Sequence, residues 1–310
     1  MVAAIEVSGL RKQYGTTRAV DGIDFAVPVG HVFAFLGPNG AGKTTTTEIL
    51  EGLRPRTGGE VRVLGLDPWR DGTALHRRVG VIPQEFHFFE KIHPKEAIEY
   101  YGELFGIRPD PAKLLARVHL TEKADAKFDT LSGGQKQKLG LALALVNDPE
   151  ICFLDEPTTG LDPQARRAIW EVISALRAEG RTVFLTTHYL EEAELLADEV
   201  AIIHRGRIIV RGPPAGIVAA HGRPDRLRIP RGASSAGELH RELALPVEVR
   251  DAGLDVELVA PGDARRVFDA LDRRHLPWDG FSVERDTLED VFVRMVGRMD
   301  DGELKGGPAP

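Results

Sequence analysis

A single loop, GPNGAGKT at residues 37–44, constrains the possible folds of this chain more than any other segment. It fits the pattern G-x-x-x-x-G-K-[ST], follows the strand-like run HVFAFL and precedes TTTTEILEGL, which we expect to form a helix. Its glycines let backbone N–H groups turn inward around phosphate oxygens, and the helix N-terminus adds partial positive charge. Lys43 would reach the β and γ phosphates, and the Thr44 hydroxyl would bind Mg²⁺. The glycines expected to allow this close approach are Gly37, Gly40 and Gly42.

Two carboxylates end a second apolar strand, ICFLDE, at residues 151–156. Ligands of open α/β sheets bind at the carboxyl edge of the strands, which is where Asp155 and Glu156 should lie. Asp155 would hold Mg²⁺ through water, whereas Glu156 would polarise the attacking water as a general base. The alternative is that both acids only cap a neighbouring element. The phosphate loop upstream favours the catalytic interpretation.

The string LSGGQ at residues 131–135 predicts the start of a helix. Ser132 can accept from the backbone of the next turn while Gln135 reaches back, which is the pattern of a capping box. Gly133 and Gly134 would leave bare N–H groups pointing outward, which makes an anion site. Alone, the string would be an ordinary helix cap without a ligand. Its position about twenty residues before ICFLDE favours the anion site.

Composition excludes several classes of function. The formal net charge is −7 and no dense block of Lys or Arg occurs, so we expect no nucleic-acid partner. The single cysteine, Cys152, lies in an apolar strand, where we expect a buried, inert thiol in a reducing compartment. The N-terminus lacks the pattern of a secretory signal, and the most apolar run, residues 139–146, is too short to span a bilayer. We therefore expect another chain to make any membrane crossing.

The first part of the chain predicts an α/β domain. From Ile5 to about Val210, apolar strand-like runs alternate with helical patterns, which favours a mainly parallel sheet covered by helices. The pattern becomes mostly helical after Gln84, with helices expected at residues 95–107 and 111–118. We therefore predict an α/β domain over residues 1–220, with a helical subdomain at about 85–148.

A second, smaller domain is expected at residues 221–298. The Gly- and Pro-rich segment RGPPAGIVAAHGRPD before it is interpreted as a linker. The pattern that follows has the βαββαβ order of the ferredoxin-like arrangement, with elements expected at 226–230, 235–244, 247–259 (a hairpin), 263–274 and 280–286. A last helix should follow Thr287, which can cap it with Asp290. Residues 299–310 are polar and predicted to form a disordered tail.

GPNGAGKT, LSGGQ and ICFLDE at these separations resemble the nucleotide-binding subunit of an ATP-binding cassette (ABC) transporter, over about residues 4–212. The resemblance implies an α/β fold of the P-loop NTPase ABC ATPase type, with a mainly parallel sheet, an antiparallel β subdomain and a helical insert, followed here by a small α+β ferredoxin-like domain. It implies an ATPase that uses ATP and Mg²⁺, works as a homodimer and energises a separately encoded transmembrane permease. Such a subunit is cytoplasmic and peripheral on the inner face of the cell membrane.

The resemblance also implies roles for four residues outside the three strings, although each has a simpler interpretation. Tyr14 resembles the aromatic residue that stacks on adenine, and its alternative is a core tyrosine at a strand edge. Gln84 resembles the glutamine that contacts Mg²⁺ or the attacking water and senses the membrane partner; alone it is a polar strand end. His188 resembles the histidine that touches the γ-phosphate, whereas a lone histidine there is usually structural. Asp162 resembles the aspartate that contacts the opposite subunit.

In this family the LSGGQ of one subunit closes over the nucleotide held by the other, so a composite site is implied. The catalytic residues would be Lys43, Gln84, Glu156 and His188, and the Mg²⁺ ligands would be Thr44, Gln84 and Asp155. ATP would be bound in cis by Tyr14, Gly37, Pro38, Asn39, Gly40, Ala41, Gly42, Lys43, Thr44 and Thr45. It would be bound in trans by Ser132, Gly133, Gly134, Gln135 and Asp162. One departure from the family pattern is His31, at a position where a glutamate is common, and it lies outside this set.

Three further strings, at residues 51–65, 156–163 and 287–292, are similar to the daunorubicin-resistance type of ATPase subunit, which exports drugs, antibiotics or lipids. The competing class is a soluble cassette ATPase that acts on ribosomes or DNA, but the chain lacks a second cassette and a long coiled coil. A binding module without turnover would be favoured by the loss of Glu156 or His188, and both are present. The second domain could stabilise a dimer or sense a ligand. The cargo is not readable from the sequence.

Overall fold

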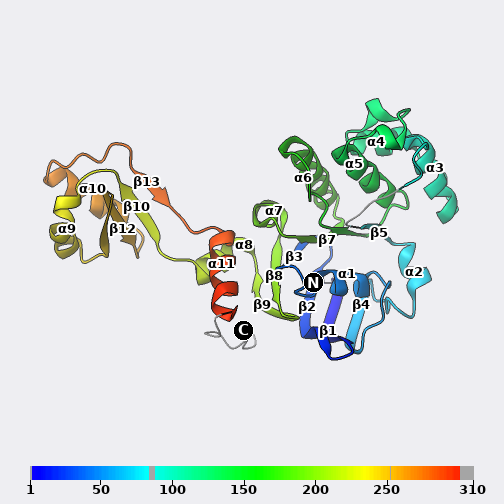
Figure 1. Cartoon of the computed structure of the whole chain (residues 1–310), viewed down its shortest axis with the longest axis horizontal. Coiled ribbons are helices and arrows are strands. Elements are labelled where there is room, and N and C mark those ends of the chain that lie inside the picture. Colours follow the sequence, from blue (N-terminus) through cyan, green and yellow to red (C-terminus); the bar gives the residue numbers. More distant parts are fainter. Residues whose placement is uncertain (1, 84–87, 252, 301–310) are drawn as a thin grey trace. The chain divides into compact units, whose positions relative to one another are not determined.

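The computed structural model describes residues 2–83, 88–251 and 253–300, which form two compact units (Figure 1). The first unit comprises residues up to Ala215 and those from Arg298, and the second comprises Gly216–Gly297. Gln84 and most of the predicted tail lie outside the described residues. No helix within the described ranges is both long enough and apolar enough to cross a bilayer.

A six-stranded sheet forms the centre of the first unit, with the strand order β5-β6-β7-β3-β8-β9. Five strands are parallel, and β9 at one edge is antiparallel to β8. The inner strands are buried along their whole length because helices or a second sheet cover both faces, which explains their unbroken apolar runs. The strands span Val79–Ile82 (β5), Ile151–Asp155 (β6), Thr182–Thr187 (β7), Val32–Leu36 (β3), Glu199–His204 (β8) and Arg207–Gly212 (β9).

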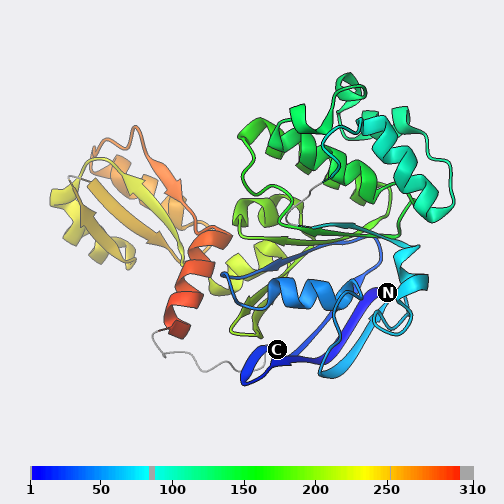
Figure 2. The ribbon, with the colours of Figure 1, turned by 45° about the vertical axis from the view of Figure 1, so that its right-hand side comes forward.

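An antiparallel sheet packs over one face of the central sheet, with α1 (Lys43–Leu50) between the two (Figure 2). Its order is β2-β1-β4, and its strands span Ala3–Tyr14 (β1), Thr17–Pro28 (β2) and Gly58–Val63 (β4). Phenylalanines fill the space between the sheets: the ring centroids of Phe25 and Phe33 lie 5.3 Å apart, and those of Phe33 and Phe184 lie 5.7 Å apart. The predicted antiparallel β subdomain is therefore confirmed.

Helices cover the opposite face of the central sheet and form the predicted helical insert (Figure 2). Leu139, Leu141 and Leu143 of α5 pack in one buried cluster with Ile98 of α3 and Leu154 of β6. The helices of the first unit, besides α1, are α2 (Gly72–His76), α3 (Pro94–Phe105), α4 (Pro111–Arg117), α5 (Gly133–Ala144), α6 (Pro163–Ala178) and α7 (Leu190–Leu196). Short 3₁₀ turns occur at Thr121–Lys123 and Phe128–Thr130.

The second unit has the predicted βαββαβ order and an antiparallel sheet with the order β11-β12-β10-β13. This strand order is that of the ferredoxin-like arrangement, so the fold class is confirmed. Helices α9 and α10 bury their leucines and valines against one face of the sheet. The elements are β10 (Asp225–Ile229), a 3₁₀ turn (Ala233–Ser235), α9 (Ala236–Leu243), β11 (Val247–Arg250), β12 (Gly253–Leu258), α10 (Asp263–Arg273), β13 (Ser282–Glu284) and α11 (Leu288–Asp300).

The segment predicted to be a linker is partly helical, so that prediction was wrong in part. Strand β9 continues to Gly212, and Pro214–His221 forms α8. Proline is well tolerated in the first turn of a helix, and the run AGIVAA after it contains no further breaker, so the Pro-rich stretch starts a helix here. The cap predicted for the last helix is confirmed, since the N–H and hydroxyl of Thr287 donate to Asp290 at 2.8 and 2.7 Å. That helix reaches Asp300, past the predicted start of the tail.

Candidate functional site

The phosphate loop joins β3 to α1 in the strand–loop–helix order that the sequence predicts. Two of its glycines are required by the backbone of the protein itself. A Cβ on Gly37 would lie 2.3 Å from the carbonyl oxygen of Ile203, and one on Gly42 would lie 2.4 Å from that of Ala19. Gly40 differs, because it has a φ of +77° and no atom lies within 4 Å of its Cβ position. The loop is therefore fixed at both ends and faces open space at Gly40.

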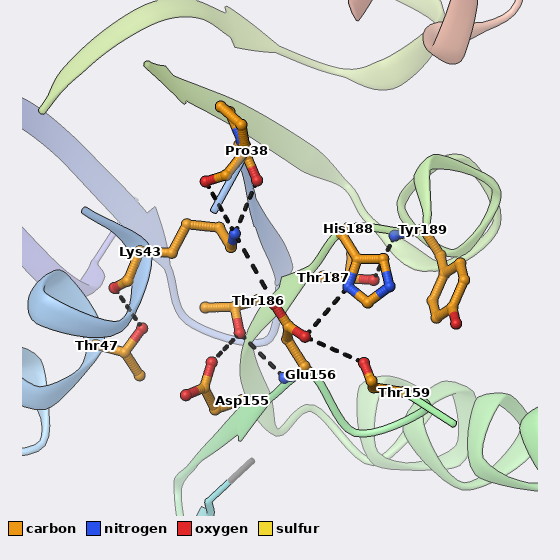
Figure 3. Close-up of polar contacts among 11 residues, drawn as sticks. Pro38, Lys43, Thr47, Asp155, Glu156, Thr159, Thr186, Thr187, His188 and Tyr189 are labelled. Atoms are coloured by element: carbon orange, nitrogen blue, oxygen red, sulfur yellow. Dashed lines mark hydrogen bonds and ion pairs between the residues drawn. The ribbon is translucent and has the colours of Figure 1, made fainter. Parts of the chain in front are cut away.

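Lys43 is buried beside this loop (Figure 3). Its Nζ donates to the carbonyl oxygens of Gly37, at 2.7 Å, and Pro38, at 3.4 Å. The same atom lies 3.8 Å from Oε1 of Glu156. Burial lowers the pKa of Lys43, and the negative charges of Glu156 and Asp155 act against that shift. The ammonium group is thus held at a fixed point between the phosphate loop and β6.

The backbone turns sharply at Glu156, the first residue after β6. Its φ of +48° lies in the left-handed region, which is uncommon for a residue with a side chain. Its N–H donates to the carbonyl oxygen of Thr186 at 3.0 Å. Its Oε2 accepts from the Thr159 hydroxyl at 3.1 Å and lies 3.1 Å from Nδ1 of His188 (Figure 3). The buried Glu156 carboxylate is therefore oriented from several sides.

Thr186, near the end of β7, links Asp155 to Glu156. Its hydroxyl donates to Oδ1 of Asp155 and accepts from the N–H of Glu156 at 3.1 Å. Burial raises the pKa of Asp155, whereas the hydrogen bond from Thr186 opposes that shift. The structure therefore brings Lys43, Asp155, Glu156 and His188 together, as the sequence predicts.

The LSGGQ string begins α5 with the predicted capping box. The N–H of Gln135 donates to Oγ of Ser132 at 3.3 Å, and the N–H of Ser132 donates to Oε1 of Gln135 at 3.0 Å. Gly134 packs closely on α6, since a Cβ there would lie 2.7 Å from that of Ala165. Asp162 caps the same helix by accepting from the N–H of Ala165 at 2.8 Å. Ser132 and Asp162 are both exposed, and in the described part of the chain neither has a hydrogen bond to Lys43 or Asp155.

The remaining predicted ligands differ in their exposure. Tyr14 is 40% exposed, which disagrees with the alternative of a core tyrosine, and the Nζ of Lys12 lies 4.9 Å from its ring centroid. Asn39 and Thr44 are exposed, while Thr45 is half-buried and Ala41 is buried. Gln84 lies outside the described residues.

Three residues of this region were not identified from the sequence. Thr186 and Thr159 contact the two acids directly. Glu192 is fully buried and accepts from the Thr158 hydroxyl at 3.1 Å and from Nε1 of Trp170 at 2.9 Å. Burial raises the pKa of Glu192. The paired threonines in TVFLTTH were the only sequence signal, because they end a strand at the edge where ligands bind.

The residues present fit a phosphate ligand and Mg²⁺. The hydroxyl of Thr44, an exposed residue, and the carboxylate of Asp155 are hard oxygen ligands, which Mg²⁺ prefers. The open backbone at Gly40 and the N-terminus of α1 supply donors for an anion. The buried ammonium of Lys43 adds positive charge beside the phosphate loop, near Glu156.

Comparisons with known proteins agree on one family. A family model described as ABC transporter matches residues 20–159. The Nod factor export ATP-binding protein I of Paraburkholderia xenovorans is 40% identical, over 96% of this chain and 98% of that protein. The daunorubicin/doxorubicin resistance ATP-binding protein DrrA of Streptomyces peucetius is 38% identical, over 96% of this chain and 94% of that protein. The similarity to both relatives extends through both units.

Solved structures agree with these relatives. An ATP-binding subunit of an ABC transporter superimposes with a TM-score of 0.64 at 28% identity, covering 71% of this chain and 93% of that one. The cbiO1 protein of Clostridium perfringens, part of the transporter complex cbiONQ, gives a TM-score of 0.63 at 27% identity, covering 72% of this chain and 93% of that one.

Proposed function

This chain belongs to the ABC transporter family as an ATP-binding subunit, and from that premise we propose that its hydrolysis of ATP powers export through a separate permease. The activity itself, the hydrolysis of ATP with Mg²⁺, is that of the family. The observation that carries the proposal is that the Glu156 carboxylate has the ammonium of Lys43 at 3.8 Å from one oxygen and Nδ1 of His188 at 3.1 Å from the other. Both relatives belong to export or resistance systems, which favours transport over action on ribosomes or DNA.

Each side chain of the cluster has a distinct proposed role. Lys43 binds the β and γ phosphates, with its ammonium already desolvated and directed along the loop. Glu156 accepts a proton from the attacking water, and the hydrogen bonds from Thr159 and His188 keep its carboxylate in place. Mg²⁺, held by Thr44, Asp155 and Gln84, would neutralise charge on the phosphates. Tyr14 stacks on the adenine ring, which its 40% exposure allows.

We further propose that two copies of the chain complete each other's sites. Ser132 and Gly133 are exposed at the N-terminus of the 12-residue helix α5, where the helix dipole and free N–H groups favour an anion. Gly134 and Gln135 shape that turn, and Asp162 is exposed beside it. In a homodimer this surface would cover the γ-phosphate bound by the partner's loop, so the isolated monomer should hydrolyse ATP poorly.

The first unit also carries a candidate docking surface for the permease. A cavity of about 250 Å³, here called the recess, opens between β5, α3 and the end of α5. Tyr101 and Phe105 line it, and Tyr100 and Leu104 are exposed on the same helix at 42% and 65%. An exposed apolar surface of this kind is typical of a protein–protein contact. We propose that a cytoplasmic segment of the permease binds here, which would place the subunit on the inner face of the membrane.

We also propose that the chain comprises an ATP-binding domain over residues 1–220 and an accessory domain over residues 221–298. Deletion of the accessory domain distinguishes its two candidate roles, since loss of the dimer would indicate dimer stabilisation and an unchanged dimer would favour ligand sensing. The transported molecule would be a drug, antibiotic or lipid, by analogy with the relatives' names. Co-expression with a neighbouring gene product that has an apolar six-helix pattern tests the proposal. We expect a membrane complex whose ATP hydrolysis exceeds that of the isolated subunit, and failure of any such complex to form would contradict it.

A further inference from the structure

Glu51 is the one carboxylate that lines the recess among the described residues. It directly follows α1, and its side chain is 4% exposed. Its main chain is fully used, since its N–H donates to the carbonyl oxygen of Thr47 at 2.9 Å and its own carbonyl oxygen lies 2.8 Å from Nε2 of His76. Its carboxyl group, in contrast, has no hydrogen bond or ion pair within the described part of the chain. A buried acid without a partner is costly to keep.

The surroundings of Glu51 favour a positively charged ligand. Among the described residues, no Lys or Arg lines the recess. Burial raises the pKa of Glu51 to about 8, and the charges of Asp155 and Glu48 add to that shift. Within the described ranges, the other titratable groups that line the recess are the His76 imidazole and the Tyr101 hydroxyl. A cation placed here would therefore meet an acidic group that nothing else in the described structure satisfies.

The apolar part of the recess limits which cation fits. Tyr101 and Phe105 of α3 line the recess with aromatic side chains, and Leu53 and Leu143 also line it. A hydrated metal ion or a free ammonium ion would leave these apolar side chains unused. An arginine or lysine side chain carries its charge on an apolar stem, and a peptide segment can place apolar neighbours beside it. The recess therefore fits a basic side chain within an otherwise apolar segment.

We propose that Glu51 is the recognition residue of the docking surface and forms an ion pair with an arginine or lysine from the permease. This inference rests on the proposed docking of a permease at the recess. Glu51 would thereby select among permeases. A segment that places a neutral or acidic residue opposite Glu51 would leave the buried carboxyl group unpaired. When the pair forms, Glu51 gives up its proton to solvent and the carboxylate binds the cation.

The inference can be tested on the full-length chain with small probes. Phenethylguanidinium carries an aromatic ring and a charged guanidinium group, and phenethylurea is its uncharged analogue of similar shape. Binding is followed by NMR through the backbone amide signals of Gly80, Val81 and Ala144, which line the recess. We expect phenethylguanidinium to shift these signals in a saturable way, with at least tenfold higher affinity than phenethylurea.

Two variants separate the role of Glu51 from nonspecific attraction. Glu51→Gln should bind both probes equally, because the charge is lost while the shape is kept. Glu103→Gln removes the same charge from an exposed position on the neighbouring helix α3, and it should keep the tenfold preference. Wild-type protein supplies an independent check. Its preference for phenethylguanidinium over phenethylurea should increase between pH 6 and pH 9 as Glu51 ionises.

Three results would overturn the inference: equal affinity of the two probes, an unchanged preference in Glu51→Gln, or no saturable shift with either probe. The proposed function is tested separately, because formation of a membrane complex does not depend on the identity of these probes. A complex that forms and hydrolyses ATP equally well with Glu51→Gln would reject the recognition role and leave the export function intact. If no membrane complex forms but the recess still prefers phenethylguanidinium, the proposed permease partner is rejected. The charge selectivity of the recess would then stand.

Discussion

The ammonium of Lys43 lies 3.8 Å from the carboxylate of Glu156, and the exposed fractions of the two side chains are only 6% and 9%. Opposite charges in such a poorly solvated place depend on each other, because removal of one leaves the other buried without compensation. The residue proposed to bind phosphate and the residue proposed to activate water are therefore electrostatically coupled. Substitutions at either position should alter both chemistry and stability.

Lys43→Ala should abolish hydrolysis, with a fall in kcat of at least about 100-fold, because the charge that meets the phosphates is lost. The free energy of unfolding should also fall by about 1–3 kcal/mol, since Glu156 is left without its cation. Steady-state ATPase assays and urea denaturation measure the two effects. Lys113→Ala, at an exposed position on α4, is the control and should change neither. Turnover retained at saturating MgATP would contradict the phosphate-loop assignment.

Glu156→Gln should bind ATP normally and lose hydrolysis by about 10²–10⁴-fold, because the amide keeps the shape of the side chain but cannot accept the proton. Since ATP is then trapped between two subunits, size-exclusion chromatography with MgATP should show a dimer. Glu171→Gln, at an exposed position on α6, should behave as wild type. A monomer under these conditions, or near-normal hydrolysis, would count against the proposed role.

Thr186→Val should reduce kcat about tenfold or more while the KM for ATP changes less. The substitution removes the hydroxyl that donates to Asp155 and accepts from the N–H of Glu156, but it keeps the volume of a buried strand residue. Steady-state kinetics with the isolated subunit measure both constants. An unchanged kcat would show that the orientation of the two acids does not depend on Thr186.

Mixing two inactive variants should restore activity if the sites are completed in trans. Lys43→Ala lacks a working phosphate loop, and Ser132→Arg blocks the turn at the start of α5 by size and charge. In a mixed dimer, one site combines the intact phosphate loop of the Ser132→Arg chain with the intact α5 turn of the Lys43→Ala chain. ATPase activity should therefore appear only when the two proteins are combined, and a mixture as inactive as its components would argue against the composite site.

Stability should depend on pH through Glu51. Its pKa is raised from 4.5 to about 8 in the folded chain, so the unfolded chain loses this proton at a lower pH than the folded chain does. The group therefore costs no stability below pH 4.5, and the cost grows between pH 4.5 and 8 to a few kcal/mol. Urea denaturation should show Glu51→Gln to be more stable than wild type at pH 8 and about equal at pH 4.5. Equal stability at both values would contradict the burial of an unpaired acid.

The parts of the site that depend on local sequence could be predicted. The phosphate loop, the helix cap at Ser132 and the strand before Asp155 each follow from neighbouring residues, and the structure has all three. The roles of the threonines could not be predicted in this way. Thr186 reaches Asp155 only because β6 and β7 pair in a register that places these two residues side by side, although 31 positions separate them in sequence.

Tertiary packing explains the other differences. Glu51 follows a helix in a charged sequence context that normally indicates an exposed residue, yet the helical insert and β5 close around it. Gly37 and Gly42 were expected to make room for phosphate, but they also make room for the carbonyl groups of Ile203 and Ala19. Contacts of this kind join distant segments, so the pattern of one segment does not reveal them.

The left-handed turn at Glu156 has a consequence for how adjacent acids share one ligand. Successive side chains of an extended strand point to opposite faces, so Asp155 and a Glu156 in strand geometry would diverge. The φ of +48° rotates the second side chain away from that alternation, while the Thr186 hydroxyl contacts the carboxylate of Asp155 and the main-chain N–H of Glu156. The spacing of the two negative charges is therefore set by the main chain, and a change that straightened this single peptide would disable the chemistry while every functional side chain remained present.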